Sequence, residues 1–291
     1  MRLHAPFTIR HAEHGLEAAL DLLDGLRDLL TRQQHRPARE PYLSIISHAV
    51  EKLLPFAAPD FTATLHTATF WNLLQATGTP RQPILHRIVL HELNIQIPTL
   101  IRAREELEAL KAYATRPGLP VVYDTNMLNH YNRPDTIDWR TVVRRAIGQR
   151  VTAVRLIVPQ EVIGELDRQK YGEGDLARRA TSAIRYLDTA LLTAPPGQPA
   201  QIRENVTLET RLAPPGPAHN TDTDWQILMC ADELHHLNPT AGVHVLTNDR
   251  NMRLRAGQLQ LPTLTLGNEF RKDQKACTGA CPRSPSPCPS L

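Results

Sequence analysis

Residues 116–126 read RPGLPVVYDTN, and the character of the chain changes within this stretch. The prolines and the glycine of RPGLP end the helical pattern that precedes them, because proline lacks a backbone donor and disfavours a helical conformation in the residue before it. A short apolar run, VVYD at 121–124, follows immediately and ends in a carboxylate. We interpret this run as the first buried strand of a domain.

Further apolar runs and helical patterns alternate after this first strand. The runs are AVRLIVP at 153–159, VHVLT at 243–247 and LPTLTL at 261–266. Helical patterns lie between them, near 140–147, 160–169, 175–193, 223–237 and 250–256. Such alternation is typical of an α/β domain with a mostly parallel sheet between layers of helices. We therefore expect this domain over residues 119–271, with Pro-rich surface loops at 194–199 and 213–217.

Residues 1–118, ahead of this domain, show a helical pattern throughout. Five leucines recur at three- and four-residue steps and so share one helix face: Leu16, Leu20, Leu23, Leu26 and Leu30. Further apolar stretches lie near 42–53, 61–75 and 85–114. Pro98 is inside the last stretch and is expected to kink or break it. We predict an all-α N-terminal region of unknown role.

The end of the chain, KDQKACTGACPRSPSPCPSL at 272–291, has almost no bulky apolar residue and is expected to be disordered. Its three cysteines form no Cys-x-x-Cys pair and have no nearby histidine, so we interpret them as free thiols rather than zinc ligands. They are Cys277, Cys281 and Cys288. Cys230 is alone in an apolar helical stretch.

The overall composition is that of a globular protein, with 41% hydrophobic and 22% charged residues. A net charge of +3 permits a nucleic-acid partner without requiring one. No apolar stretch approaches the roughly 18 residues of a membrane span, and the first residues lack the apolar run of a signal peptide. We expect a cytoplasmic protein that does not enter a membrane.

Acidic residues occur where the predicted strands give way to helices. Asp124 ends the first strand, Glu165 lies about two turns into the helix after the second, and Asp249 follows the strand at 243–247. Asp222 and Asp224 begin another helix. Each alone has an ordinary explanation as a helix cap or a solvated side chain. Together, however, four chain segments bring carboxylates to one edge of the sheet. This arrangement indicates a functional site, because active groups gather at the carboxyl ends of parallel strands.

Carboxylate oxygens are hard ligands of the kind that Mg²⁺ or Mn²⁺ prefers. A cluster of such acids would repel itself without a cation, so the charge balance also implies a metal.

Four motifs resemble those of the PIN-domain nucleases: DTN at 124–126, VPQEVIGELDRQK at 158–170, TDTDWQIL at 221–228 and VLTNDRNMRLRAG at 245–257. The resemblance covers roughly residues 119–271. It implies a three-layer PIN-like (5′-nuclease-like) fold. It also implies a hydrolase, a Mg²⁺- or Mn²⁺-dependent endoribonuclease that cuts single-stranded or flexible RNA and leaves a 5′-phosphate and a 3′-hydroxyl.

The resemblance also assigns roles to the acids. Asp124 and Asp249 are expected to hold the main ion, and Glu165 and Asp224 to complete the metal-binding cluster. Asp222 is a second candidate for the third acid, as a direct ligand or in a supporting role. Two polar residues match supporting positions of the family, Asn126 and Thr247.

Cationic residues close to these acids in the sequence are candidates for binding the phosphates of RNA. The residues that we single out are Arg168, Lys170 and Arg250. Each of them also fits an ordinary solvated helix face.

Two other functions are considered. A haloacid-dehalogenase-like phosphatase also begins from an aspartate after its first strand, but it needs an acid where this chain has Asn126. A catalytically silent PIN fold that serves as an RNA-binding or assembly scaffold is the alternative to the nuclease. The N-terminal helices are expected to bind a protein partner, to mediate self-association or to regulate the nuclease.

Overall fold

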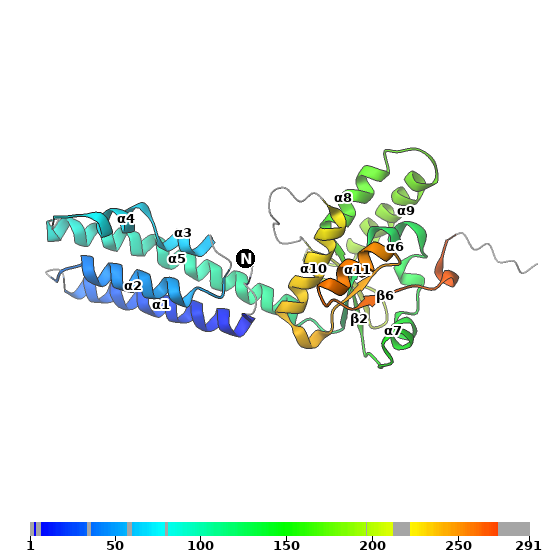
Figure 1. Cartoon of the computed structure of the whole chain (residues 1–291), viewed down its shortest axis with the longest axis horizontal. Coiled ribbons are helices and arrows are strands. Elements are labelled where there is room, and N and C mark those ends of the chain that lie inside the picture. The colour runs from blue at the N-terminus through cyan, green and yellow to red at the C-terminus, as the bar shows by residue number, and fades with distance from the viewer. Residues whose placement is uncertain are drawn as a thin grey trace, which may run out of the picture. The chain divides into compact units, whose positions relative to one another are not determined.

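The computed structural model of the chain describes residues 3, 7–33, 36–56, 60–78, 81–195, 197–211 and 222–272, with only the backbone of 60–62 (Figure 1). The loop expected at 213–217 and the expected tail beyond Lys272, with its three cysteines, lie outside these residues. The described residues form two compact units. The helical unit contains those up to 117 together with 232–242, and the sheet unit contains the others.

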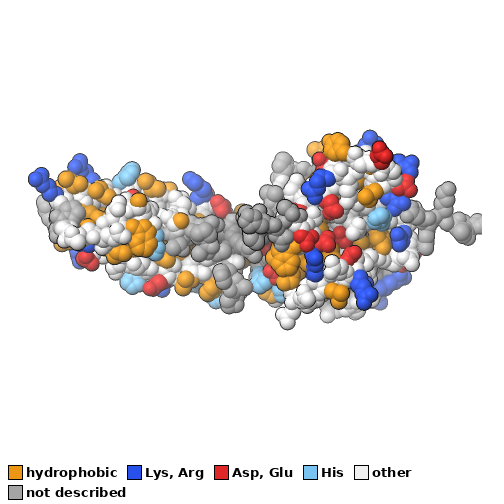
Figure 2. All heavy atoms as spheres, turned by 45° about the horizontal axis from the view of Figure 1, so that its top comes forward, with side chains coloured by type: hydrophobic (Ala, Val, Ile, Leu, Met, Phe, Trp, Pro, Cys, Tyr) orange, Lys and Arg blue, Asp and Glu red, His pale blue; other side chains and the backbone are white. Residues whose placement is uncertain are grey.

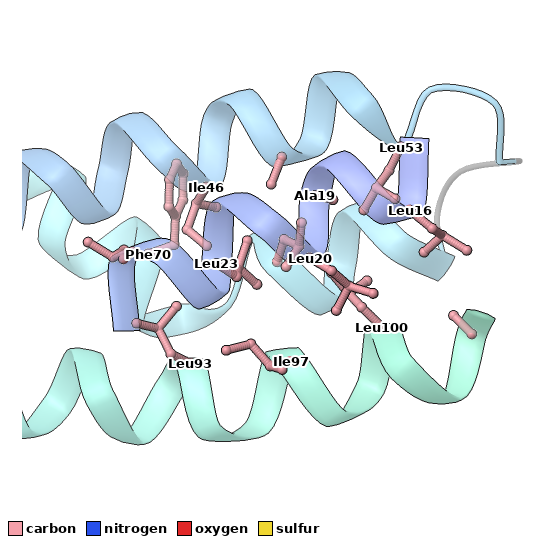
Figure 3. Packing of buried hydrophobic residues seen from close by; sticks show 14 of the residues in the cluster. Leu16, Ala19, Leu20, Leu23, Ile46, Leu53, Phe70, Leu93, Ile97 and Leu100 are labelled. Carbon is pink, nitrogen blue, oxygen red and sulfur yellow. The ribbon is translucent and has the colours of Figure 1, made fainter. Parts of the chain in front are cut away.

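The helical unit is built from five helices at the start of the chain. They are α1 (Ile9–Arg32), α2 (Arg39–Lys52), α3 (Asp60–Leu65), α4 (Ala68–Gln75) and α5 (Gln82–Ala114). The five leucines predicted to share one face of α1 are all buried. They pack with apolar side chains of α2, α4 and α5, as the labelled cluster in Figure 3 shows. Burial of this continuous apolar face is what stabilises the unit.

Two sequence predictions for this unit differ from the structure. The stretch 61–75 forms two helices rather than one, because Thr67 caps α4 by accepting a hydrogen bond from the Phe70 amide at 3.3 Å. The helix α5 continues through Pro98 without a break. Buried Ile97 and Leu100 on either side of the proline hold the helix against the core, which offsets the missing backbone donor.

The sheet unit contains one six-stranded sheet with the strand order β3-β4-β2-β1-β5-β6. The strands are β1 (Leu119–Tyr123), β2 (Val154–Pro159), β3 (Ala200–Arg203), β4 (Val206–Arg211), β5 (His244–Leu246) and β6 (Thr263–Leu264). All neighbouring strands are parallel except the antiparallel pair β3–β4. The predicted fold class, an α/β domain with a mainly parallel sheet after a mostly helical region, is therefore confirmed.

Six α-helices alternate with these strands: α6 (Thr125–His130), α7 (Trp139–Ile147), α8 (Gln160–Gln169), α9 (Gly174–Leu191), α10 (Thr223–Leu237) and α11 (Arg250–Gln258). Short 3₁₀ turns lie at Pro134–Thr136, Pro239–Ala241 and Asn268–Phe270. The last residues of α10, from Asp232 onward, belong to the helical unit. Cys230 is buried on this helix. None of the helices in the described part of the chain is long and apolar enough to cross a membrane.

The hairpin β3–β4 and the short helix α6 were not predicted. The hairpin turns at Glu204-Asn205, with Asn205 at a φ of 58°. Its second strand includes Glu209, which forms a buried ion pair with Arg155 of the neighbouring β2. The charged residue interrupts the apolar pattern by which a buried strand is recognised.

Candidate functional site

The centre of the site is the carboxyl end of the neighbouring strands β1 and β5, where the order of the strands reverses. From β1 the chain continues to β2 on one side, whereas β5 lies on the other side. In open parallel sheets, ligands bind at the carboxyl ends of strands at such a reversal. Asp124 follows β1 directly, and its amide donates to the Leu246 carbonyl of β5 at 3.1 Å. The backbone pairing therefore places Asp124 at the carboxyl end of both strands.

Asp124 is held by two hydrogen bonds on its carboxylate. One oxygen accepts from the Thr247 hydroxyl at 2.7 Å, and the other accepts from the Asn126 amide at 3.2 Å. The second bond makes Asp124 the N-cap of α6. Asn126 thus supports Asp124 through its backbone, while its own side chain is exposed.

Burial raises the pKa of Asp124 to about 6, since its side chain is only 2% exposed. The bonds from Thr247 and Asn126 act in the opposite direction, and the negative charges of Asp224 and Glu165 raise the pKa further. Asp124 is therefore a buried carboxyl group surrounded by other acids.

Thr247 connects Asp124 with Asp249. The Thr247 hydroxyl donates to Asp124 and accepts from the Asp249 amide at 3.0 Å. Asp249 in turn caps α11 by accepting from the Met252 amide at 2.9 Å. Asp249 is therefore a helix cap, as its position in the sequence also allowed. Its charge nevertheless acts on Asp224, so it belongs to the acidic edge of the sheet as well.

Glu165 is held by a hydrogen-bond chain that the sequence analysis did not identify. One carboxylate oxygen accepts from the Thr125 hydroxyl at 2.6 Å, and the other accepts from the Gln169 amide group at 3.0 Å. The Gln169 oxygen accepts from Asn129 at 2.7 Å. Gln169 lies one turn after Glu165 on α8, and this spacing was a usable signal. Thr125 and Asn129 share a face of α6, which was not predicted.

Asp222 and Asp224 lie at the start of α10 and have different neighbours. Asp222 accepts from the Asp224 amide at 3.1 Å and from the Arg255 guanidinium of α11 at 2.5 Å. Burial raises the pKa of Asp224, and the charges of Asp222 and Asp249 raise it further, whereas Arg255 lowers it. The pKa of Asp224 therefore responds to its acidic neighbours, while Asp222 is the acid that forms an ion pair with Arg255.

The acids from four chain segments are thus brought together at one edge. Asp124 is electrostatically coupled to Asp224 and Glu165, and Asp224 is coupled to Asp249. Acidic side chains gather on the face of the sheet unit seen in Figure 2. Within the described residues, no three His, Cys, Asp or Glu side chains lie close enough to hold an ion. The donors themselves suit Mg²⁺ or Mn²⁺, because they are carboxylates whose mutual repulsion a cation would relieve.

The three cationic candidates lie at the ends of helices beside this edge. Arg168 is exposed in the last turn of α8, and Arg250 is exposed as the first residue of α11. The Lys170 ammonium pairs with Asp167 and lies 4.8 Å from the ring centre of Tyr171. Tyr171 itself is 78% exposed. These positions allow contact with a polymer, and their roles stay predictions.

A comparison with protein families matches this part of the chain to the PIN domain, over residues 121–266. The match begins in β1, ends just after β6 and includes all four acids. No curated protein matches the chain. Because the match covers half of the 291 residues and coincides with the parallel sheet and its acidic edge, the chain belongs to the PIN domain family, whose members are generally metal-dependent nucleases.

Proposed function

We propose that this protein is a metal-dependent endoribonuclease that hydrolyses phosphodiester bonds of single-stranded or flexible RNA. The observation that carries the proposal is Asp124, a buried carboxyl group with a pKa of about 6 that other acids surround. Burying a charge is costly unless it is compensated. A divalent cation supplies that compensation, and the same cation can activate water for the hydrolysis of a phosphodiester.

The four acids have distinct places in this proposal. Asp124 and Asp249 hold the main ion, and Glu165 and Asp224 complete the cluster. When bound, Mg²⁺ or Mn²⁺ lowers the pKa of a water molecule and neutralises charge that develops on the phosphate. Asp222 stays in a supporting role, because its carboxylate is already engaged by Arg255.

The neighbouring polar residues orient the acids. The Thr247 hydroxyl fixes one oxygen of Asp124 and the backbone of Asp249 at the same time. Thr125 and Gln169 each engage one oxygen of Glu165, so that this side chain is not free to rotate away from the edge. Catalysis benefits from groups held before the substrate arrives.

The choice of RNA rests on the family likeness, and the position of the cations supports contact with a nucleic-acid backbone. Arg168 and Arg250 are exposed at the ends of helices that carry or follow an acid. Guanidinium groups bind phosphate through paired N–H donors. We propose that these two residues and Lys170 hold phosphates on either side of the cut, leaving a 5′-phosphate and a 3′-hydroxyl.

The proposal is tested by cleavage of labelled single-stranded RNA with Mg²⁺ or Mn²⁺, comparing the wild type with Asp124→Asn. The matched control is Asp188→Asn on α9, an exposed aspartate outside the cluster. Cutting that needs the metal, is lost in Asp124→Asn and persists in Asp188→Asn supports the proposal. Wild-type protein that cuts neither RNA nor single-stranded DNA with either ion contradicts it.

A catalytically silent scaffold is the second candidate. The observation in its favour is that no three acids of the described residues converge closely enough to bind one ion in this structure. Such a protein would bind RNA without cutting it, with an affinity that is independent of divalent ions. The cleavage assay and an RNA-binding assay with and without Mn²⁺ therefore separate the two functions.

A further inference from the structure

A second charged feature of the sheet unit is a pocket beside α7, away from the elements that carry the acids. It has a volume of about 280 Å³ and is lined by Asp138, Arg140, Thr141, Arg144, Arg150 and Val151. In the view of Figure 1, α7 lies at the lower side of this unit, whereas α8 and α9 lie at its upper side. None of the four acids, nor any of the three cationic candidates, lines the pocket.

The local sequence explains why three arginines meet here. Arg140 and Arg144 are one turn apart on α7 and therefore share a face. Gly148 ends the helix with a φ of 71°, a left-handed conformation that glycine adopts readily. The chain turns back at this glycine, and Arg150 reaches the same pocket.

The pocket has an excess of positive charge. Its one carboxylate, Asp138, caps α7 and accepts from the Thr141 amide at 3.3 Å and from the Thr141 hydroxyl at 2.7 Å. Arg140, Arg144 and Arg150 are all exposed, and none forms an ion pair with any residue in the described part of the chain. Three arginines and one carboxylate line this hollow, so its net charge is positive and would attract an anion.

The size and the lining of the pocket define the kind of anion. A volume of 280 Å³ lies just below the range of about 300–1,000 Å³ for sites that enclose drug-sized ligands. No aromatic side chain is among the described residues that line the pocket, so it lacks the aromatic platform on which successive bases stack. Arginine forks match the oxygens of a phosphate. The pocket thus suits one phosphate group of a polymer. The rest of the polymer would lie outside the pocket.

We infer that the pocket of Arg140, Arg144 and Arg150 binds a backbone phosphate of the RNA substrate at a distance from the cut. This inference rests on the proposed function for the identity of the polymer. Contacts of this kind carry no sequence information, but they add affinity that depends on salt. The pocket would hold a long strand while another part of it lies at the acids.

The test is the binding of labelled, 5′-hydroxyl single-stranded RNA to the full chain carrying Asp124→Asn, measured by fluorescence anisotropy at several salt concentrations. The pocket variant combines Arg140→Gln, Arg144→Gln and Arg150→Gln. The control variant removes the same charge from exposed arginines of α5, by Arg87→Gln, Arg102→Gln and Arg104→Gln. A lysine version of the pocket variant keeps the charge and checks for structural damage.

We expect the pocket variant to bind RNA several-fold more weakly near 0.1 M salt, because the contact with one backbone phosphate is lost. The slope of log Kd against log salt should fall by about 0.7, the approximate value for one phosphate on a single strand. Single-stranded DNA should lose as much affinity as RNA, since a phosphate contact does not read the 2′-hydroxyl. The control variant should change affinity less than twofold, and the lysine version should recover most of the affinity and the salt slope.

Several results would overturn the inference. If the pocket and control variants lose the same affinity for RNA, the loss is caused by the lower net charge of the protein and not by a binding site. Unchanged binding by the pocket variant would show that the pocket does not bind the backbone. A loss seen only with 5′-phosphorylated RNA would assign the pocket to a terminal phosphate instead. Because binding is measured without cleavage, a wild type that does not cut RNA refutes the proposed function while leaving this test intact.

Discussion

At the scale of the residue, Asp124 couples the stability of the fold to pH. A folded-state pKa of about 6, raised from 3.8 mainly by burial, means that the folded protein holds this proton more tightly than the unfolded chain. The resulting stabilisation is fully present below pH 3.8 and is lost as the pH rises through about 6. A shift of roughly two units corresponds to about 3 kcal/mol. We predict this loss in denaturant unfolding of the wild type from pH 4 to 7 with a chelator present.

The matching control for this prediction is Asp124→Asn, in which the group cannot titrate. This variant should lack the decrease and should be more stable than the wild type at pH 7 without metal. Saturating Mn²⁺ should restore wild-type stability at pH 7, because the ion binds the charged form. An equally steep decrease in Asp124→Asn would assign the titration to another group.

A second residue-scale prediction concerns the hydroxyl that holds Glu165. Thr125→Val keeps the shape of the side chain and removes the donor at 2.6 Å. Losing a hydrogen bond to a charged group costs about 1.5–3 kcal/mol, so we expect kcat to fall roughly tenfold or more with little change in KM. Thr125→Ser should recover most of this loss, and Thr189→Val on α9 should have no effect. A serine variant as impaired as the valine variant would refute the role of the hydroxyl.

The candidate site was partly predictable at this scale. Asp124, Asp224 and Asp249 could be singled out because each follows a strand or begins a helix, and Glu165 because it lies on the helix after the second strand. These are local patterns. Thr125 could not be assigned to Glu165, because their contact joins α6 to α8 across 40 residues of chain, whereas the four-residue spacing of Gln169 from Glu165 was a usable signal. The pairing of Asp222 with Arg255 also depends on the packing of two helices, which the sequence pattern does not contain.

At the scale of the element, the close approach of α1 and α2 depends on a glycine. A side-chain methyl group at Gly15 would collide with the Lys52 carbonyl at the end of α2. Gly25, on the same helix, has no atom within 4 Å of such a methyl group. We predict that Gly15→Ala destabilises the helical unit by about 1–3 kcal/mol through overpacking. Gly25→Ala should stabilise it by about 0.5–1 kcal/mol through helix propensity.

Thermal or denaturant unfolding of the two glycine variants checks this prediction. The pair is informative because both variants add the same methyl group to the same helix. Similar shifts for both would mean that α1 and α2 adjust without cost, and that the tight approach does not limit this substitution.

The salt bridge between α10 and α11 gives another element-scale prediction. Arg255 lowers the pKa of Asp224 and pairs with Asp222, so it is a fixed positive charge among the acids. Arg255→Gln should increase the affinity for Mn²⁺ several-fold, because a competing cation is removed. Arg253→Gln, an exposed residue of the same helix, is the control. Calorimetric titration that shows weaker Mn²⁺ binding in Arg255→Gln would mean that Arg255 orders the site instead.

Helices and strands could be predicted where the local sequence pattern is strong. They could not be predicted where contacts between distant parts of the chain decide the structure. The parallel strands β1, β2 and β5 and the long helices follow from apolar periodicity. The hairpin β3–β4 did not, because Glu209 interrupts the apolar pattern of β4 with a charge, and its partner Arg155 lies on another strand. The continuity of α5 through Pro98 also depends on the burial of its neighbours in the helical core, which propensity alone does not reveal.

At the scale of the whole molecule, the boundary between the two units does not fall at a single point of the chain. Residues 232–242 belong to the helical unit although they follow the acidic start of α10. Leu237 is 7% exposed and lies in the helical core, and Asn238 donates to the Ala114 carbonyl at the end of α5 at 3.0 Å. A protein cut before residue 118 would therefore leave this segment without the residues on which it packs.

We predict that the chain without residues 1–117 retains metal-dependent cleavage but unfolds at a lower temperature. All four acids and the residues that hold them lie between 124 and 255, so the chemistry does not need the missing helices. Leu237 becomes exposed, and the end of α10 loses a hydrogen bond. In the full chain, Leu237→Ala should reproduce part of the loss, about 2–5 kcal/mol, by creating a cavity. Cleavage of RNA and thermal unfolding are measured on both proteins.

The comparison of rates then indicates what the helical unit does. A truncated protein that cuts faster than the full chain would show that the helices restrain the nuclease, and an equal rate would leave binding of a partner or a second copy as their role. Equal rates together with unchanged self-association and partner capture would remove both roles. A truncated protein that stays folded yet no longer cuts would contradict the prediction, because it would place part of the catalytic machinery outside residues 118–272.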